Sequence, residues 1–191
     1  LLDIGAPSEE RVRQSSAIIG RQVRHMTRLV DDLLDVSRVT RGLIELDKVP
    51  LDMRAVVDEA VEQVRPLIEA RHHELAVELP AGPVHASGDR TRLVQVLSNI
   101  LNNAAKYTPA GGQIALRVMA HGERVTVIVT DNGIGIEPDV LPYIFELFTQ
   151  AERTPDRSQG GLGIGLALVK SLVTLDGGTV AARAAPGRGS E

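Results

Sequence analysis

The chain has 191 residues, 43% of them hydrophobic and 24% charged, which allows one ordinary domain with a sizeable core and a shorter additional segment. Its formal net charge of −4 offers no general attraction to nucleic acid or to an anionic membrane, so we expect neither as a partner. Cysteine is absent and no apolar run approaches the roughly 18 residues of a membrane span, which excludes disulfides and thiolate metal sites and predicts a cytoplasmic chain without a membrane segment.

The first predicted element is a long helix over residues 8–42. Ser8 stands in an N-cap position with two acidic residues in the turn after it, and Gly42 stands where a C-cap belongs. A heptad seam follows the helix through Val12, Ser16, Ile19, Val23, Met26, Val30, Leu33, Ser37 and Thr40. At 1.5 Å per residue the helix is about 50 Å long, and so narrow an apolar stripe needs a partner helix. It is either a coiled-coil spacer or the second half of a helical hairpin that dimerises into a bundle.

From residue 43 onward the pattern alternates between strands and helices. We predict strands over 43–52, 74–80 and 178–185, helices over 53–71, 89–107, 138–150 and 164–175, and a hairpin over 112–133 that turns at His121 and Gly122. Mixed order with a hairpin predicts an α/β fold, a two-layer α/β sandwich with helices on one face of a mixed sheet. We divide the chain into two domains, residues 1–42 and residues 43–191.

Three short segments carry candidate chemistry, and the last of them is "GGLGIGLALVK" at residues 160–170. Its glycines remove side chains where a helix begins, so that free backbone N–H groups and the positive end of the helix dipole face any approaching phosphate. A flexible glycine turn before a helix explains the same letters. A dinucleotide-binding loop is disfavoured because the spacing is G-x-G-x-G and no strand precedes it, and a P-loop is excluded because no Gly-Lys-Ser/Thr follows.

The second segment, "DNGIGI" at residues 131–136, directly follows a predicted strand. Asp131 is held at the strand end, where its carboxylate can accept the exocyclic amine of adenine. Two glycines then let the backbone pass tightly around a planar ligand. A plain turn is the alternative, whereas a calcium loop lacks the further acids that it requires.

The first segment, "NILNNAAKYT" at residues 99–108, ends a predicted helix. Asn99 and Asn103 lie one turn apart on one helix face, and Lys106 follows within the next turn. An amide oxygen with waters and phosphates suits magnesium, and the lysine supplies a positive charge for a phosphate. Asparagine is unfavourable inside a helix, which argues that these residues are not filler.

In this order the three segments resemble the N, G1 and G2 boxes of the ATP-binding domain of sensor histidine kinases, within the wider family of DNA gyrase, Hsp90 and MutL. The stretch "YIFELFTQ" at 143–150 resembles the F box that begins the ATP lid. The stretch "RHMTRLVDDLLDVSR" at 24–38 resembles the second helix of the kinase dimerisation domain. The resemblance covers nearly the whole chain and implies a Bergerat-type ATP-binding fold preceded by one bundle-forming helix.

The resemblance also implies ATP and Mg²⁺ as cofactors and assigns roles by position. Asn103 is the implied magnesium ligand, with Asn99 beside the phosphates. Lys106 and Tyr107 contact phosphate or the sugar side of the nucleotide, and Asp131 binds adenine N6. The base pocket is shaped by Gly133, Gly135 and Ile136, and the remaining implied ATP-binding residues are Thr149, Arg157, Gly161, Leu162, Gly163, Ile164, Gly165 and Leu166. Of these, Arg157 is either a contact to the γ-phosphate or a solvated charge of the lid.

No histidine of the chain matches the phosphoacceptor of the family, which lies on the first dimerisation helix before an acidic residue and a proline. His25 lies on the second helix without an adjacent acid, and His73 imitates the start of the pattern inside a predicted strand. We therefore expect the acceptor upstream of this chain and interpret both chain ends as cuts in a larger protein. The fragment is expected to bind ATP without being able to phosphorylate itself.

The implied function is that of a kinase core which transfers the γ-phosphate to the upstream histidine and thence to the receiver domain of a response regulator. The implied assembly is a homodimer through the helix of residues 8–42. Two other functions stay open, a nucleotide-binding scaffold (a degenerate kinase) and a gyrase-type ATP hydrolase. Hydrolysing members of the family place a glutamate four residues before the magnesium asparagine, where this chain has Asn99, which cannot take a proton at neutral pH.

Overall fold

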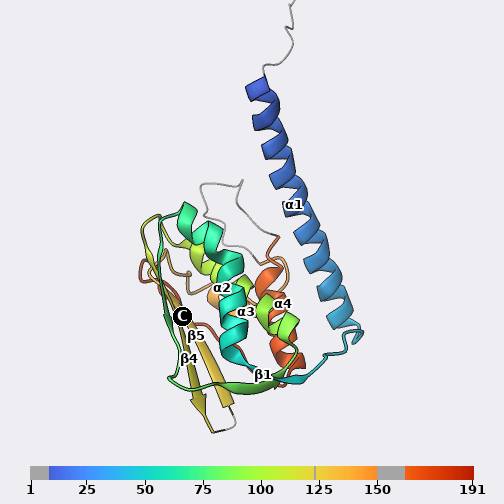
Figure 1. The fold of residues 1–191 in the computed structure, drawn as a ribbon, viewed down its shortest axis with the longest axis vertical. Coiled ribbons are helices and arrows are strands. Elements are labelled where there is room, and N and C mark those ends of the chain that lie inside the picture. Colours follow the sequence, from blue (N-terminus) through green and yellow to red (C-terminus); the bar gives the residue numbers. More distant parts are fainter. Residues whose placement is uncertain (1–8, 123, 150–161) are drawn as a thin grey trace, which may run out of the picture.

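The computed structural model describes residues 9–122, 124–149 and 162–191. Its elements in chain order are α1 (Glu9–Thr40), β1 (Val49–Asp52), α2 (Met53–Ala70), β2 (Glu74–Glu78), β3 (His85–Gly88), α3 (Arg90–Tyr107), β4 (Gln113–His121), β5 (Arg124–Asp131), the 3-10 helix η1 (Leu141–Tyr143) and α4 (Gly165–Leu175). Helix α1 lies against α4 with its C-terminal part and projects beyond the rest of the molecule with the other end (Figure 1).

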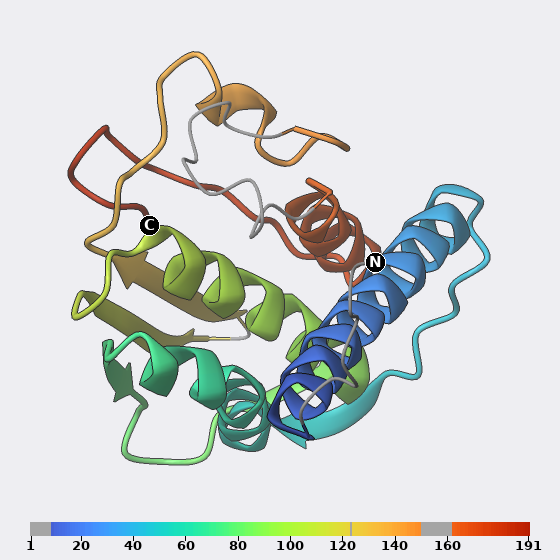
Figure 2. The same ribbon diagram turned by 90° about the horizontal axis from the view of Figure 1, so that it is seen from above.

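Among the described residues, a mixed sheet has the order β2-β4-β5. Strands β2 and β4 run parallel with Glu74 opposite Gln113, whereas β4 and β5 form an antiparallel hairpin with His121 opposite Arg124. Strands β1 and β3 make a separate antiparallel pair. Helices α2, α3 and α4 lie on one side of the mixed sheet, as Figure 2 shows, so the predicted two-layer α/β sandwich is confirmed.

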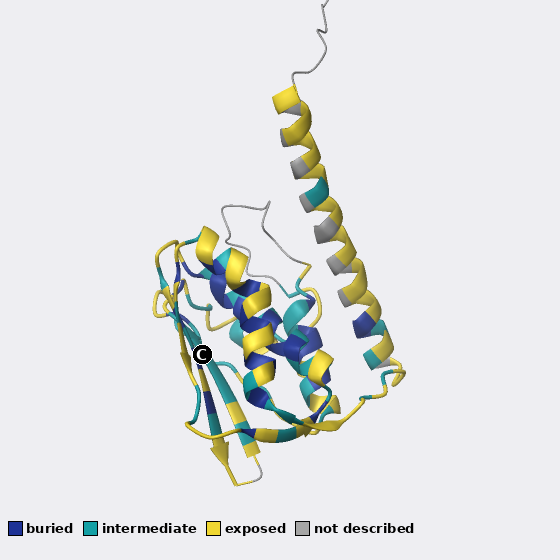
Figure 3. Ribbon diagram, in the orientation of Figure 1, coloured by how far each residue is buried: buried dark blue, intermediate teal, exposed yellow. Residues whose placement is uncertain are grey.

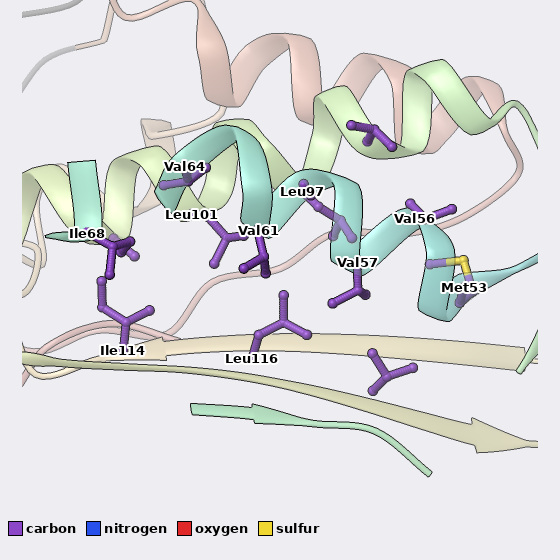
Figure 4. Close-up of a cluster of buried hydrophobic side chains, with 14 of the residues drawn as sticks. Met53, Val56, Val57, Val61, Val64, Ile68, Leu97, Leu101, Ile114 and Leu116 are labelled. Atoms are coloured by element: carbon purple, nitrogen blue, oxygen red, sulfur yellow. The ribbon is translucent and has the colours of Figure 1, made fainter. Parts of the chain in front are cut away.

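The main core lies between the sheet and the helices α2 and α3. Figure 4 shows side chains of both helices pointing toward Ile114 and Leu116 of β4. Val56, Leu101 and Leu116 are completely buried. In each helix the buried positions recur at steps of three and four, which is the spacing of one helix face. This spacing fixes which face of α3 packs on the sheet.

A second apolar cluster joins α1, α3 and α4. Its buried members are Val36, Val96, Ile164, Leu168, Val169 and Leu172. Beside it, the carboxylate of Asp35 accepts hydrogen bonds from Arg92 (Nη1–Oδ2 2.7 Å) and from Gln95 (Nε2–Oδ2 2.9 Å). Both Asp35 and Val36 are buried near the end of α1, so this end of the helix is held by apolar and polar contacts together.

The helix ends follow local chemistry of the sequence. Asp52 caps α2 by accepting from the amide of Arg54 (3.1 Å), and Asp89 caps α3 by accepting from the amide of Arg92 (3.2 Å). Gly42 ends α1 with a φ of 65°, which confirms its predicted C-cap role, while Ser8 lies outside the described residues.

Most of α1 is exposed, as Figure 3 shows along its whole projecting length. Its exposed large hydrophobic residues are Val12, Ile18, Ile19, Val23, Met26, Val30, Leu33 and Leu34. Met26 and Ile19 are 63% and 62% exposed. The seam predicted from the heptad pattern therefore has no cover within the described chain. In the same described ranges, none of the helices combines the length and apolar character that crossing a membrane requires.

The predicted short helix over residues 138–150 is wrong. Its described part holds only the 3-10 helix η1, followed by turns. Pro138 and Pro142 have no amide to donate, and Phe148 adopts a positive φ of 64°, so an α-helical ladder cannot continue through the segment.

The predicted strands at the two ends of the sandwich are also partly wrong. Residues 178–183 are irregular backbone, and Ala184 makes only an isolated bridge with Ser190. The first strand forms over Val49–Asp52 alone, where it pairs with His85–Gly88, a strand that the sequence did not predict. In each case the presence of a neighbouring backbone, not the local alternation of side chains, decides which residues form a strand.

Candidate functional site

The C-terminal half of α3 presents a polar face away from the sheet. Leu101, Ala104 and Ala105 are buried in the core. Asn99 and Asn103 lie on another face of the helix and are half-buried. Lys106 and Tyr107, also half-buried, contact each other at the end of the helix, as the following distances show. The Nζ atom donates to the tyrosine hydroxyl (3.1 Å) and lies 4.7 Å from the ring centroid.

Asp131 ends β5 at the edge of the sandwich. Its Oδ1 accepts a hydrogen bond from the amide of Gly133 (2.8 Å), and its backbone pairs with that of Ser190. Burial raises the pKa of the Asp131 carboxyl, while hydrogen bonds from Gly133 and Ser190 oppose the rise without cancelling it. The result is a fixed, half-buried carboxyl group with acceptor capacity for a ligand amine.

The two glycines after Asp131 permit close backbone approaches. A Cβ at Gly133 would lie 2.6 Å from the carbonyl oxygen of Tyr107. Gly135 has a φ of 71°, and a Cβ there would collide with the carbonyl of Ala185. The loop at 131–136 is therefore packed between the end of α3 and the C-terminal segment, where the amide of Gly187 donates to Ile134 (2.8 Å).

The start of α4 lies beside α3. A Cβ at Gly165 would be 3.8 Å from the side-chain carbon Cγ of Asn99, so the first turn of α4 faces this asparagine. The Nδ2 atom of Asn99 is buried and has no hydrogen-bond partner among the described residues. An unpaired buried donor next to the amides of a helix N-terminus fits an anionic ligand group.

The loop that leads into α4 is held by a second close approach. Gly163 has a φ of 70°, and a Cβ there would lie 2.6 Å from the carbonyl oxygen of Thr149. Its own carbonyl accepts from the amide of Phe148 (3.1 Å), which ties residues 148–149 to the loop. Ile164 is buried in the second apolar cluster, so only its backbone is available to a ligand. Leu166 is half-buried, and Leu162 is exposed.

Other predicted site residues are placed less specifically. Ile136 is half-buried, and no hydrogen bond of its backbone or side chain is recorded. Arg157 and Gly161 lie outside the described residues. The described residues bring parts of the three predicted segments together, because the carbonyl of Tyr107 accepts from the amide of Ile134 and Asn99 lies beside Gly165.

No group of three or more His, Cys, Asp and Glu side chains that could hold a metal ion occurs in the described parts of the chain. The half-buried amide of Asn103 suits the hard-oxygen chemistry of magnesium.

Sequence reasoning missed two contributions to this region. The pairing of Ser190 with Asp131 joins residues 59 apart in the chain, and only the two glycines around residue 188 indicated a tight turn there. Arg71 and His73 donate to carbonyls at the end of α3, although nothing in their local pattern indicates this.

The chain matches the protein family described as "Histidine kinase-, DNA gyrase B-, and HSP90-like ATPase" over residues 88–191, more than half of its length. It is 33% identical over 172 residues to the sensor histidine kinase RppB of Synechocystis sp., with coverage of 90% of this chain and 38% of that protein. It is 34% identical over 184 residues to the alginate biosynthesis sensor protein KinB of Pseudomonas aeruginosa, with coverage of 96% and 30%. The chain thus spans less than two fifths of the length of these relatives.

Solved structures give the same picture of the fold. The crystal structure of full-length ShkA in complex with AMPPNP superposes with a TM-score of 0.79 at 29% identity, covering 99% of this chain and 39% of that one. The Acinetobacter baumannii histidine kinase AdeS superposes with a TM-score of 0.76, covering 98% of this chain and 84% of that one. At 23% identity the second likeness concerns the fold alone.

The raised pKa of Asp131 predicts a pH signature in stability. A carboxyl group whose pKa is higher in the folded than in the unfolded chain keeps its proton longer when folded, so the wild-type free energy of unfolding falls as the pH rises through that window. Asp131→Asn removes this titration. We expect the free energy of unfolding of Asp131→Asn relative to wild type to increase from about pH 4 upward and to level off.

Urea unfolding at a series of pH values measures this difference, and Asp139→Asn, at an exposed aspartate, is the matched control. A difference that stays constant or declines with rising pH would contradict the assignment.

Proposed function

We propose a function for this chain from one premise, that it belongs to the family of histidine kinase-, DNA gyrase B- and HSP90-like ATPases. It is the kinase core of a two-component sensor histidine kinase. Residues 43–191 bind ATP with Mg²⁺, and residues 1–42 are the second half of the dimerisation domain. The γ-phosphate goes to a histidine upstream of this chain and from there to the receiver domain of a response regulator.

The observation that carries the proposal is the buried, unpartnered Nδ2 of Asn99 at the start of α4. A buried donor without a partner is unfavourable, and a phosphate oxygen at that place would satisfy it. The amides at the N-terminus of α4 lie beside it and carry the positive end of a helix dipole. At the other end of the site, Asp131 offers a fixed acceptor for the exocyclic amine of adenine.

The residues present suit phosphoryl transfer mainly by positioning a charged substrate. Asp131 and the loop at 131–136 would hold the base, the amides of residues 163–166 would hold phosphate oxygens, and Asn103 would contribute an oxygen to the metal. Bound Mg²⁺ supplies neutralisation of the charge on the phosphates. In the transfer, the bond from the γ-phosphorus to the β-γ bridging oxygen breaks, a bond from phosphorus to a histidine nitrogen forms, and ADP leaves.

The amide side chain of Asn99 argues against hydrolysis as the main reaction. A general base for water must accept a proton near neutral pH, and a carboxamide cannot do so. The carboxyl of Asp131 lies at the end of β5, and its Oδ1 accepts a hydrogen bond from the amide of Gly133. The acceptor is therefore a nucleophile supplied from outside the site, which a histidine on a bundle helix provides.

The exposed apolar seam of α1 supports a homodimer. Val23 and Met26 are 55% and 63% exposed, and they belong to a row of large hydrophobic side chains on a helix that projects beyond the sandwich (Figure 3). A contiguous exposed apolar row indicates an interaction surface. A second copy of the same helix, together with the first helix of each hairpin, covers this row in a bundle.

Binding of MgATP tests the site directly. In Asn103→Ala we expect the dissociation constant of MgATP, measured by isothermal titration calorimetry, to rise by about tenfold or more, since a lost polar contact to a charged partner costs about 1.5–3 kcal/mol. Affinity for ATP in EDTA should change little. Asn102→Ala, one position away on the same helix, is the matched control. The magnesium role fails if both variants bind MgATP equally well.

The reaction class is tested with ATP labelled at the γ-phosphate. The isolated chain should bind MgATP but gain no acid-labile phosphate. It should also show no continuous release of inorganic phosphate. A chain extended upstream by its first helix should become labelled. Label on the isolated chain would refute the absence of an acceptor, and phosphate release that Asn99→Ala abolishes would favour a hydrolase. An extended chain that binds ATP without labelling would favour a scaffold.

Self-association is tested by replacing a seam residue with a charge. Val23→Glu places a carboxylate in the apolar row, and we expect it to shift the chain toward monomer in sedimentation velocity, because burying an unpaired charge in an interface is strongly unfavourable. Gln22→Glu adds the same charge at the neighbouring exposed position, outside the seam, and should leave self-association unchanged. Equal behaviour of the two variants would show that the seam is not the interface.

A further inference from the structure

The last turn of α3 has each of its terminal carbonyl groups paired. An α-helix leaves its last four carbonyls without partners inside the helix, and these must be satisfied from elsewhere. At the end of α3 the carbonyl of Ala104 accepts from the amide of Thr108 (3.0 Å). The three carbonyls that follow it accept from segments outside the helix.

Two of these donors are side chains of the turn that follows α2. The Nη1 atom of Arg71 donates to the carbonyl of Lys106 (3.0 Å) and lies 3.4 Å from that of Thr108. The Nε2 atom of His73 lies 3.0 Å from the carbonyl oxygen of Ala105. The third donor belongs to the site itself, since the amide of Ile134 donates to Tyr107 (3.2 Å).

The conformation of the turn at 71–73 orients these two side chains toward the end of α3. The amide of His73 donates to Ile68 (3.0 Å) and that of His72 to Glu69 (3.0 Å), which is the Schellman pattern of a helix end. Glycine is the usual residue at the left-handed position of this pattern, but here it is His72, with a φ of 55°. The turn sends His73 inward and leaves His72 exposed.

The contact fixes the chemistry of His73. A carbonyl oxygen only accepts, so the Nε2 atom carries the hydrogen and donates it. The side chain is 8% exposed, and its Nδ1 has no partner among the described residues. Its imidazole is therefore used as a single-point donor to α3, a role that the resemblance of its sequence to a phosphoacceptor motif did not suggest.

The paired carbonyls belong to the turn that carries the candidate site residues. Asn103, Lys106 and Tyr107 lie on the same stretch of backbone as Ala105, whose carbonyl His73 binds. If these carbonyls lose their donors, the last turn of α3 frays, and the side chains that it carries move with it. The contact of Tyr107 with Ile134 would loosen as well, although neither Arg71 nor His73 needs to touch a ligand.

We infer that Arg71 and His73 are positioning residues for the nucleotide site, which hold the last turn of α3 so that the side chain of Asn103 meets the metal. The inference rests on the proposed function. It makes the turn after α2 a functional part of the site, although it lies some thirty residues earlier in the sequence. Residues that orient a metal ligand without touching the metal typically change metal affinity or activity by about 10–100-fold when replaced.

The test separates positioning from general stability. His73→Leu keeps apolar bulk and removes the donor, whereas His73→Gln keeps an amide donor at similar reach. The dissociation constants of ATP are measured by calorimetry with excess Mg²⁺ and with EDTA. We expect His73→Leu to lose about tenfold in affinity for MgATP and little for ATP in EDTA, and His73→Gln to recover most of the loss. His121→Leu, at an exposed histidine of the hairpin, is the matched control.

Arg71 gives an independent second measurement if His73→Leu does not fold. Arg71→Met should lower the magnesium-dependent gain in ATP affinity and speed hydrogen exchange of the amides at 104–108, whereas Arg71→Lys should retain part of both. Unchanged magnesium dependence in both His73→Leu and Arg71→Met, or equal losses with and without magnesium, would overturn the inference. If the wild-type chain binds no MgATP at all, the proposed function falls first, so the two failures are distinguishable.

Discussion

The backbone carbonyls at the end of α3 and the backbone amides at the start of α4 have opposite roles in the candidate site. The C-terminal carbonyls of α3 are all paired, through Thr108, His73, Arg71 and Ile134. At the start of α4, by contrast, the residue before the first turn makes no side-chain cap. A helix end that is fully paired is rigid, and one whose amides are left open is ready to bind an anion. Asn99, on the same helix as the paired end, lies beside Gly165 at the start of α4.

Helix α4 borders both the candidate site and α1, the helix that carries the exposed apolar seam. It has 11 residues, of which the first lies beside Asn99. Its buried face packs on Val36 of α1. Asp176, which follows the last residue of α4, forms a 2.9 Å ion pair with Lys48, whose Nζ also donates to the Asp176 carbonyl (2.9 Å). Helix α4 therefore contacts Asn99 at its start, α1 along its buried face and Lys48 at its end.

The sequence predicts those parts of the fold whose information is local. The α2 and α3 boundaries follow from periodicity, and the end of α1 follows from Gly42. The hairpin at His121 follows from alternation and a glycine. Each of these elements satisfies its own backbone or that of its chain neighbour, so a short window of residues suffices.

The parts that the sequence did not predict depend on distant partners. Strand β3 exists because it pairs with β1, and residues 178–183 are irregular despite their alternating pattern. The role of His73 depends on the carbonyl of Ala105, 32 residues later, which no local pattern encodes. The motif residues around Asp131 were found through their resemblance to a family. The residues that hold those motifs in place required the folded chain.

Asn99 has both a structural and a chemical role in the candidate site. A carboxylate at its position would bring a negative charge next to the amides of α4 and to a phosphate, and it would also serve as a base for water. The neutral amide keeps its donor pointed into a buried place beside the first turn of α4. It can therefore hold a phosphate oxygen while leaving water unactivated. A site without a base for water agrees with the proposed transfer to a histidine.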